Sequence, residues 1–76
     1  MRTVQVNINS IEKVKSFVNT VSTYDIDFDL ISGRFVIDAK SIMGIFSLDL
    51  SKPVTLNIYN DDDNTILEQL KPFIVE

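Results

Sequence analysis

The chain has 76 residues with a net charge of −4, and 45% of the residues are hydrophobic. This length predicts a single domain, residues 1–76, near the lower limit for unaided folding, and the negative charge argues against a nucleic-acid surface. No apolar run approaches the ~20 residues of a membrane span, and the polar, alternating start from Met1 to Gln5 is not typical of a secretory signal. The absence of cysteine excludes disulfides and thiolate metal sites, which fits a reducing cytoplasm.

Histidine is also absent from the sequence. A histidine general base, a histidine metal ligand and a phosphohistidine are therefore excluded in this chain. The remaining residues form no catalytic constellation, so we expect no enzymatic activity, no cofactor and no metal.

The first segments predict a strand followed by a helix. Residues 3–8 alternate, with Val4, Val6 and Ile8 on one face, which predicts a half-buried strand. Either Asn9 or Ser10 then caps a helix, and the spacing from Asn9 to Glu12 is that of a capping box. The helix is expected to fade near Thr23, and its apolar residues recur at helical intervals: Ile11, Val14, Phe17, Val18 and Val21.

Residues 25–30 predict a second strand whose outward face carries Asp25, Asp27 and Asp29. Alternate Cα atoms on a strand lie about 6–7 Å apart, and no loop oxygens complete a coordination shell, so a solvated face is favoured over a metal site. A turn with Gly33 at positive φ follows. The return strand, residues 34–39, is expected to point Phe35 and Ile37 inward.

The segment 38–50 is the most informative part of the chain. Ser41 stands where a short apolar helix begins, so its hydroxyl is either a helix cap worth about 1 kcal/mol or a phosphorylation site, and the two roles are compatible. Ile42, Ile45 and Leu48 lie on one side of this helix. Met43 and Phe46 form a second apolar pair, which is either a docking surface or covered by a neighbouring segment.

The last third predicts a strand and a helix. Residues 54–59 alternate with Val54, Leu56 and Ile58 inward. The acidic residues 60–64 lack the glycine and the final glutamate of a calcium loop, so they better suit the start of the last helix as cap and dipole partners. Pro72 is expected to disturb the last turn of that helix, whose apolar side carries Ile66, Leu67, Leu70, Phe73 and Ile74.

The predicted order is strand, helix, strand, strand, short helix, strand, helix. This order indicates an α+β fold of two layers, in which the helices cover one face of an antiparallel sheet. Polar residues at the alternate strand positions indicate that the other face meets water.

The element order and the run from Ala39 to Ile45 (AKSIMGI) resemble HPr, the small phosphocarrier of the bacterial sugar phosphotransferase system. The resemblance spans almost the whole chain. It implies an open-faced β-sandwich with a four-stranded antiparallel sheet and three helices on one face. It also implies that Ser41 is the target of an HPr kinase/phosphorylase, and that Ile42, Met43 and Phe46 dock protein partners.

The sequence departs from the family at the phosphocarrier motif, which is a histidine, any residue, arginine and proline at the start of the first helix. Anchoring the comparison on Phe17 and Val18 puts Ser10 at the histidine position and Glu12 at the arginine position. An unactivated hydroxyl is a weak nucleophile, and Glu12 would repel a phosphoryl group. Ser10 is therefore interpreted as a helix cap.

Family members that lack the histidine but keep the serine act as regulators, so the resemblance implies a regulatory protein phosphorylated on Ser41. Its partners would be an HPr kinase/phosphorylase and a transcriptional regulator that reads the phosphoserine. The loss of the arginine departs from the surface that normally contacts such a regulator. The alternative is an unphosphorylated interaction domain of HPr fold, docking through Met43 and Phe46. The sequence leaves the partner and the oligomeric state open.

Overall fold

A computed structural model describes residues 2–59 and 64–75. The molecule measures 30 × 24 × 24 Å along its principal axes. Seven elements follow one another in the predicted order: β1 (Arg2–Val6), α1 (Ile11–Ser22), β2 (Phe28–Ser32), β3 (Phe35–Asp38), α2 (Ile42–Ile45), β4 (Val54–Ile58) and α3 (Asn64–Leu70).

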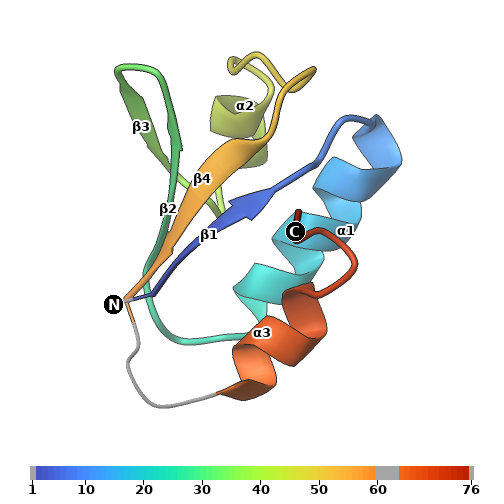
Figure 1. Ribbon diagram of the computed structural model, residues 1–76, viewed down its shortest axis with the longest axis vertical. Helices are drawn as coiled ribbons and strands as arrows, with labels where there is room; N and C mark the ends of the chain where they lie inside the picture. The colour runs from blue at the N-terminus through green and yellow to red at the C-terminus, as the bar shows by residue number, and fades with distance from the viewer. Residues whose placement is uncertain (1, 60–63, 76) are drawn as a thin grey trace.

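The four strands form one antiparallel sheet in the order β1-β4-β2-β3. Leu56 of β4 lies opposite both Val4 of β1 and Leu30 of β2, and Leu30 lies opposite Ile37 of β3. The inward residues are therefore in register across the sheet. The helices cover a single face of it (Figure 1), which confirms the predicted α+β fold.

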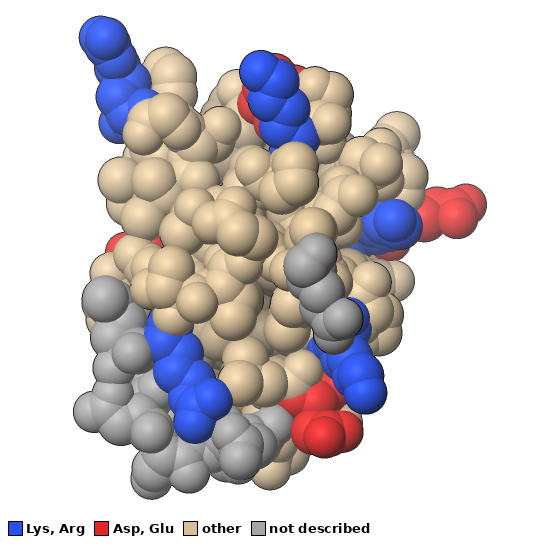
Figure 2. Space-filling view, in the orientation of Figure 1, with Lys and Arg blue, Asp and Glu red and all other residues tan. Residues whose placement is uncertain are grey.

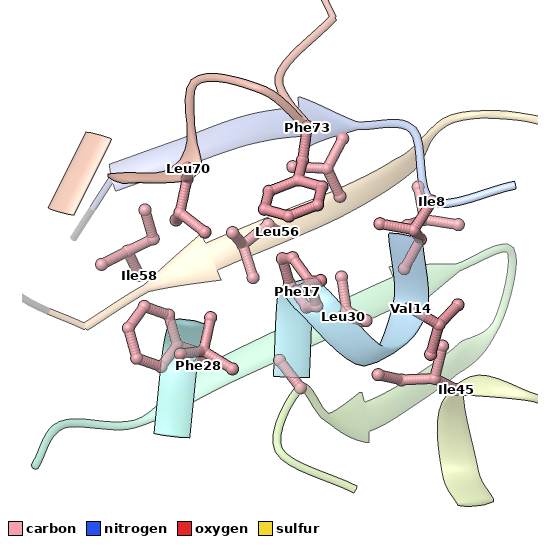
Figure 3. Close-up of a cluster of buried hydrophobic side chains, with 14 of the residues drawn as sticks. Ile8, Val14, Phe17, Phe28, Leu30, Ile45, Leu56, Ile58, Leu70 and Phe73 are labelled. Carbon is pink, nitrogen blue, oxygen red and sulfur yellow. The ribbon is translucent and has the colours of Figure 1, made fainter. Parts of the chain in front are cut away.

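The core lies between the sheet and the helices (Figure 3). The alternate residues of β4, Val54, Leu56 and Ile58, are all buried, as their pattern predicts. Phe17 of α1 meets Phe73 edge-to-face, with ring centroids 5.6 Å apart. The polar residues on the opposite side of β1 and β4 bond across the strands, as when Thr3 Oγ1 donates to Asn57 Oδ1 over 2.8 Å. Side-chain alternation thus gives the sheet one buried apolar face and one solvent-facing polar face.

The hairpin between β2 and β3 turns at Gly33 and Arg34, because Ser32 pairs with Phe35. Gly33 has φ 61°, and no other described residue has positive φ. A two-residue loop with positive φ only at its first position is a type II′ turn, which suits the twist of an antiparallel pair. The predicted glycine turn is confirmed.

The expectation that Phe35 points into the core is wrong. Alternation does put it on the helix side of the sheet with Ile37, yet the side chain is 64% exposed. Phe35 occupies the last pair before the turn, where an open hollow of about 640 Å³ is lined by Phe35, Ser47, Leu48 and Asp49. No helix of the described chain extends far enough to cover that end of the strand.

The expectation that Phe73 and Ile74 belong to the last helix is also wrong. The helix ends at Leu70, and residues 71–73 form a turn around Pro72. Ile74 then makes an antiparallel bridge with Val6, and the Val75 amide donates to the Gln5 carbonyl over 2.9 Å. The chain therefore returns along β1. The expected capping role of the acidic segment falls largely on residues 60–63, which lie outside the described residues.

Candidate functional site

Ser41 caps α2. Its backbone is extended, with φ −93° and ψ 98°, and its Oγ accepts a hydrogen bond from the Gly44 amide over 3.2 Å. The Ser41 carbonyl accepts the first helical bond, from the Ile45 amide, over 3.0 Å. The side chain of Ser41 is nevertheless exposed. The cap uses the hydroxyl oxygen as an acceptor and leaves the group accessible from outside.

The connection from β3 into α2 is fixed by Asp38. Its Oδ1 accepts from the Lys40 amide over 2.9 Å, and its carbonyl accepts from the Ser41 amide over 3.0 Å. Lys40 Nζ donates to the Tyr24 carbonyl over 2.8 Å and lies 5.9 Å from the centre of the Phe28 ring. The cation next to Ser41 in sequence is thus held against the segment that precedes β2.

Gly44 allows the hydroxyl of Ser41 to sit where it does. A Cβ atom at position 44 would lie 3.1 Å from Ser41 Oγ and 3.4 Å from Ile37 Cδ1. The first distance is tighter than ordinary van der Waals contact, so a side chain there would press on the capping hydroxyl. The close approach of Ser41 Oγ therefore explains in packing terms why a glycine suits position 44 of the AKSIMGI run.

Met43 and Phe46 are exposed, at 79% and 45% respectively. Ile42 is half-buried against the core, and Ile45 is buried. The sequence left open whether Met43 and Phe46 form a docking surface or are covered by a neighbouring segment. No described segment covers them. We call Ile42, Met43 and Phe46 the α2 patch. It is an apolar surface beside an exposed serine.

Ser10 caps α1 in the same way. Its φ is −143° and its ψ 157°, and its Oγ accepts from the Lys13 amide over 3.1 Å. Ser10 rather than Asn9 is therefore the cap, and Glu12 lies exposed in the first turn. The acidic residue occupies the end of the helix where backbone amides favour negative charge.

A hollow of about 400 Å³ adjoins this helix start, and residues from two distant segments line it. The lining residues are Ser10, Glu12, Lys13, Ser16, Pro72 and Phe73. The first four lie close together in the sequence, at the start of α1, but no sequence pattern links them to the turn that follows α3.

The two serines open different helices, and no hydrogen bond between described residues joins them. The face seen in Figure 2 is largely uncharged, with basic and acidic side chains scattered near its margins. Among the described residues, no group of three or more acidic side chains could hold a metal ion. None of the helices described is long and apolar enough to cross a membrane.

The second strand begins later than its alternation predicts: β2 starts at Phe28, so Asp29 lies on it, whereas Asp25 and Asp27 precede it. Tyr59 Oη donates to Asp29 Oδ2 over 2.9 Å, from the residue that follows β4. This hydrogen bond to the carboxylate raises the pKa of the Tyr59 phenol above its ordinary value, and burial and the charge of Asp29 add to the shift. Of the three aspartates expected on a solvated strand face, Asp29 is therefore paired with a tyrosine from the neighbouring strand's end.

Residues 4–76 match the protein family described as "PTS HPr component phosphorylation site". No curated protein matches the chain. Among solved structures, HPr-C-His from Thermoanaerobacter tengcongensis has a TM-score of 0.77 at 28% identity, covering 95% of this chain and 89% of its own. The phosphocarrier protein HPr from Bacillus anthracis has a TM-score of 0.70 at 25% identity, covering 97% and 94%. The histidine-containing phosphocarrier protein of a Mycoplasma shares the fold, with a TM-score of 0.70 at 12% identity over 93% and 86%.

Proposed function

Because this chain belongs to the HPr family of the phosphotransferase system, we propose that it is a regulatory member modified on Ser41. It would act as a single domain in the bacterial cytoplasm and dock protein partners through the α2 patch. Proteins of this family are phosphocarriers rather than enzymes. The observation that carries the proposal is an exposed serine cap directly beside an uncovered apolar surface.

The phosphocarrier role itself is not proposed, because the chain has no histidine to take a phosphoryl group from phosphoenolpyruvate-derived donors. Ser10, at the corresponding position, has its hydroxyl oxygen engaged by the Lys13 amide. Glu12 replaces the cationic partner with an anion, which disfavours an incoming phosphoryl group. Incubation with Enzyme I and phosphoenolpyruvate should therefore leave the mass of the protein unchanged.

Phosphorylation of Ser41 would form a bond between Oγ and the γ-phosphorus of ATP, release ADP, and transfer the hydroxyl proton to the kinase. The cap uses Ser41 as an acceptor, so the ester oxygen can remain near the Gly44 amide after modification. The product would carry close to two negative charges and three strong acceptor oxygens. A partner with cationic side chains would read that change, while Met43 and Phe46 supply an adaptable apolar contact.

The test is intact-mass spectrometry after incubation with an HPr kinase/phosphorylase and ATP. We expect the gain of one phosphate in the parent protein, no gain in Ser41→Ala, and an unchanged gain in Ser47→Ala. Ser47 is the matched control because it is an exposed serine at the other end of the same short helix. A gain that persists in Ser41→Ala would refute the site. No gain beside an active HPr control would refute the modification.

A second function, an interaction domain without phosphorylation, is favoured by the cap itself, because Ser41 already has a structural role. In that case a partner would contact Met43 and Phe46 whether or not the serine is modified. Met43→Ala and Phe46→Ala should then weaken binding of that partner equally with and without the kinase. A dependence on the kinase would favour the regulatory proposal.

A further inference from the structure

The two edges of the sheet differ in what lies beside them. Residues 73–75 run along β1, where Ile74 bridges Val6 and the Asn7 amide donates to the Phe73 carbonyl over 2.7 Å. At the opposite edge, no strand of the described chain pairs with the outer side of β3 (Figure 1). An uncovered edge strand presents a row of amide and carbonyl groups to another chain.

The register shows which groups of β3 face outward. Ser32 and Phe35 close a two-residue hairpin, so they form a hydrogen-bonded pair, and the Ala39 amide donates to the Phe28 carbonyl over 2.9 Å. Because hydrogen-bonded and non-bonded pairs alternate in an antiparallel ladder, the odd-numbered residues of β3 bond to β2. The amide and carbonyl of Val36 and the amide of Asp38 therefore point to the open edge.

The side chains of this edge are self-complementary. Val36 and Asp38 share the outer face of the sheet with Asp29 and Ile31, and both are exposed, Val36 at 61%. Arg34, also exposed, lies two positions before Val36. Asp38 lies two positions after it. Arg34 belongs to the turn, directly before β3, so a two-fold axis at Val36 would bring the turn that carries each Arg34 beside an Asp38 of the second copy.

We propose that β3 is a self-association edge, through which two copies of this chain pair their β3 strands antiparallel about Val36. Two hydrogen bonds would join the two Val36 residues, and an Arg34–Asp38 pair would flank them on each side. On the helix side, the exposed Phe35 would meet Ile37 of the second copy in the closer, non-bonded pair. The two four-stranded sheets would become one.

A second copy fits this edge better than an unrelated strand, because opposite charges flank Val36 at equal separation in sequence, Arg34 in the turn and Asp38 at the end of β3. The edge also lacks proline and lysine within Phe35–Asp38, the residues that commonly block edge pairing. Four residues form a small interface, of the size found in weak encounters below about 1,200 Å². The dimer should therefore form only at high protein concentration.

Sedimentation equilibrium over a wide concentration range tests the surface. The parent protein should show reversible dimerisation, and Val36→Lys should raise the dissociation constant at least about tenfold, since like charges would face each other at the axis. Ile11→Lys is the matched control, because Ile11 is equally exposed, at 62%, but lies on α1. Dimerisation unaffected by Val36→Lys, or a parent protein that stays monomeric at millimolar concentration, would overturn the proposal.

A charge exchange tests the register. Arg34→Asp should weaken the dimer at least about tenfold, and adding Asp38→Arg should restore it, because the two exchanged charges again face opposite partners. Circular dichroism would check folding of the double variant, since Asp38 also accepts from the Lys40 amide. A folded double variant without recovery would overturn the Val36-centred pairing.

Nuclear magnetic resonance gives a measurement that does not depend on variants. In a mixture of labelled and unlabelled copies, the Hα of Phe35 should show an intermolecular contact with the Hα of Ile37. The Val36 amide should also become protected from exchange as concentration rises. A dimer that shows intermolecular contacts at the α2 patch instead would overturn the assignment to β3.

Discussion

The starts of α1 and α2 share a local device and differ in what surrounds it. Ser10 and Ser41 both cap a helix by accepting from the amide three residues on, over 3.1 and 3.2 Å. α1 then continues for 12 residues and buries Val14, Phe17 and Val21. α2 lasts four residues and leaves Met43 and Phe46 exposed.

The difference shows that a capping serine does not by itself mark a functional site. At α1 the serine begins a helix whose task is to cover the sheet, and an acidic residue follows it in the first turn. At α2 the serine stands beside a glycine and an apolar surface that covers little of the core. The surroundings of the two hydroxyls, and not their capping hydrogen bonds, distinguish the candidate regulatory serine from the structural one.

The largest expected effect is a difference in unfolding free energy between substitutions of Phe17 in α1 and of Phe46 at the end of α2. Phe17→Ala should cost about 3–5 kcal/mol of the free energy of unfolding, because Phe17 is fully buried against Phe73. Phe46→Ala, at a half-exposed position, should cost about 1 kcal/mol or less. Urea denaturation of both variants measures the contrast. Similar losses would mean that α2 is as essential to the core as α1.

In contrast to the two phenylalanines, the two capping serines should cost similar amounts of stability when they are replaced. Ser10→Ala and Ser41→Ala should each cost about 1 kcal/mol, and the corresponding glycine variants only a few tenths. Urea denaturation again gives the free energies. Because the two hydrogen bonds have nearly the same length, losses differing by more than about 1 kcal/mol would show that one serine has a further structural role.

A double-mutant cycle can test the contact that is found only at α2. Gly44→Ala gains helix propensity, but its Cβ would press on Ser41 Oγ. In the Ser41→Ala background the Oγ atom is absent, so its close contact with the new Cβ is removed. Gly44→Ala should therefore be more favourable there, by up to about 1 kcal/mol. Additive effects would contradict the assignment of Gly44 to the space around the hydroxyl.

The smallest expected effect concerns pH and the segment after α2. The Ser51 hydroxyl and then the Ser51 amide donate to Asp49 Oδ1, over 2.6 and 3.1 Å, and lower the pKa of the Asp49 carboxyl from 3.8. Folding therefore favours the carboxylate, so its stabilisation is present above pH 3.8 and is lost as pH falls through the lowered pKa. Asp49→Asn should be slightly less stable than the parent protein near neutrality. The difference should shrink in denaturation measured at successively lower pH below 3.8.

Local patterns predict the order of the elements and the Ser41 cap, and they narrow the cap of α1 to Asn9 or Ser10. Alternation in residues 54–58 predicts a strand with one buried face, and Val54, Leu56 and Ile58 are all buried. A polar residue before a helical run predicts a cap, because the capping bond spans only three residues. These features depend on neighbours in sequence, so the sequence is sufficient.

The errors come from residues whose surroundings are distant in sequence. Alternation correctly assigns Phe35 to a face, but it says nothing about whether a helix reaches that far along the sheet. Phe73 and Ile74 fit the helical spacing of α3, but pairing with β1 determines their conformation. The hollow that joins Ser10 to Pro72 is hidden for the same reason.

The strand order has a consequence for how the chain acquires its structure during synthesis. β1 is made first, but its only strand-length partner in the described chain is β4, with Arg2 opposite Ile58. The β2–β3 hairpin can close at once across its short turn, whereas β1 must wait until β4 has emerged from the ribosome. Such distant pairing slows folding, because loop closure precedes any gain from contacts. Until β4 arrives, the apolar face of β1 has no neighbouring strand to complete the sheet.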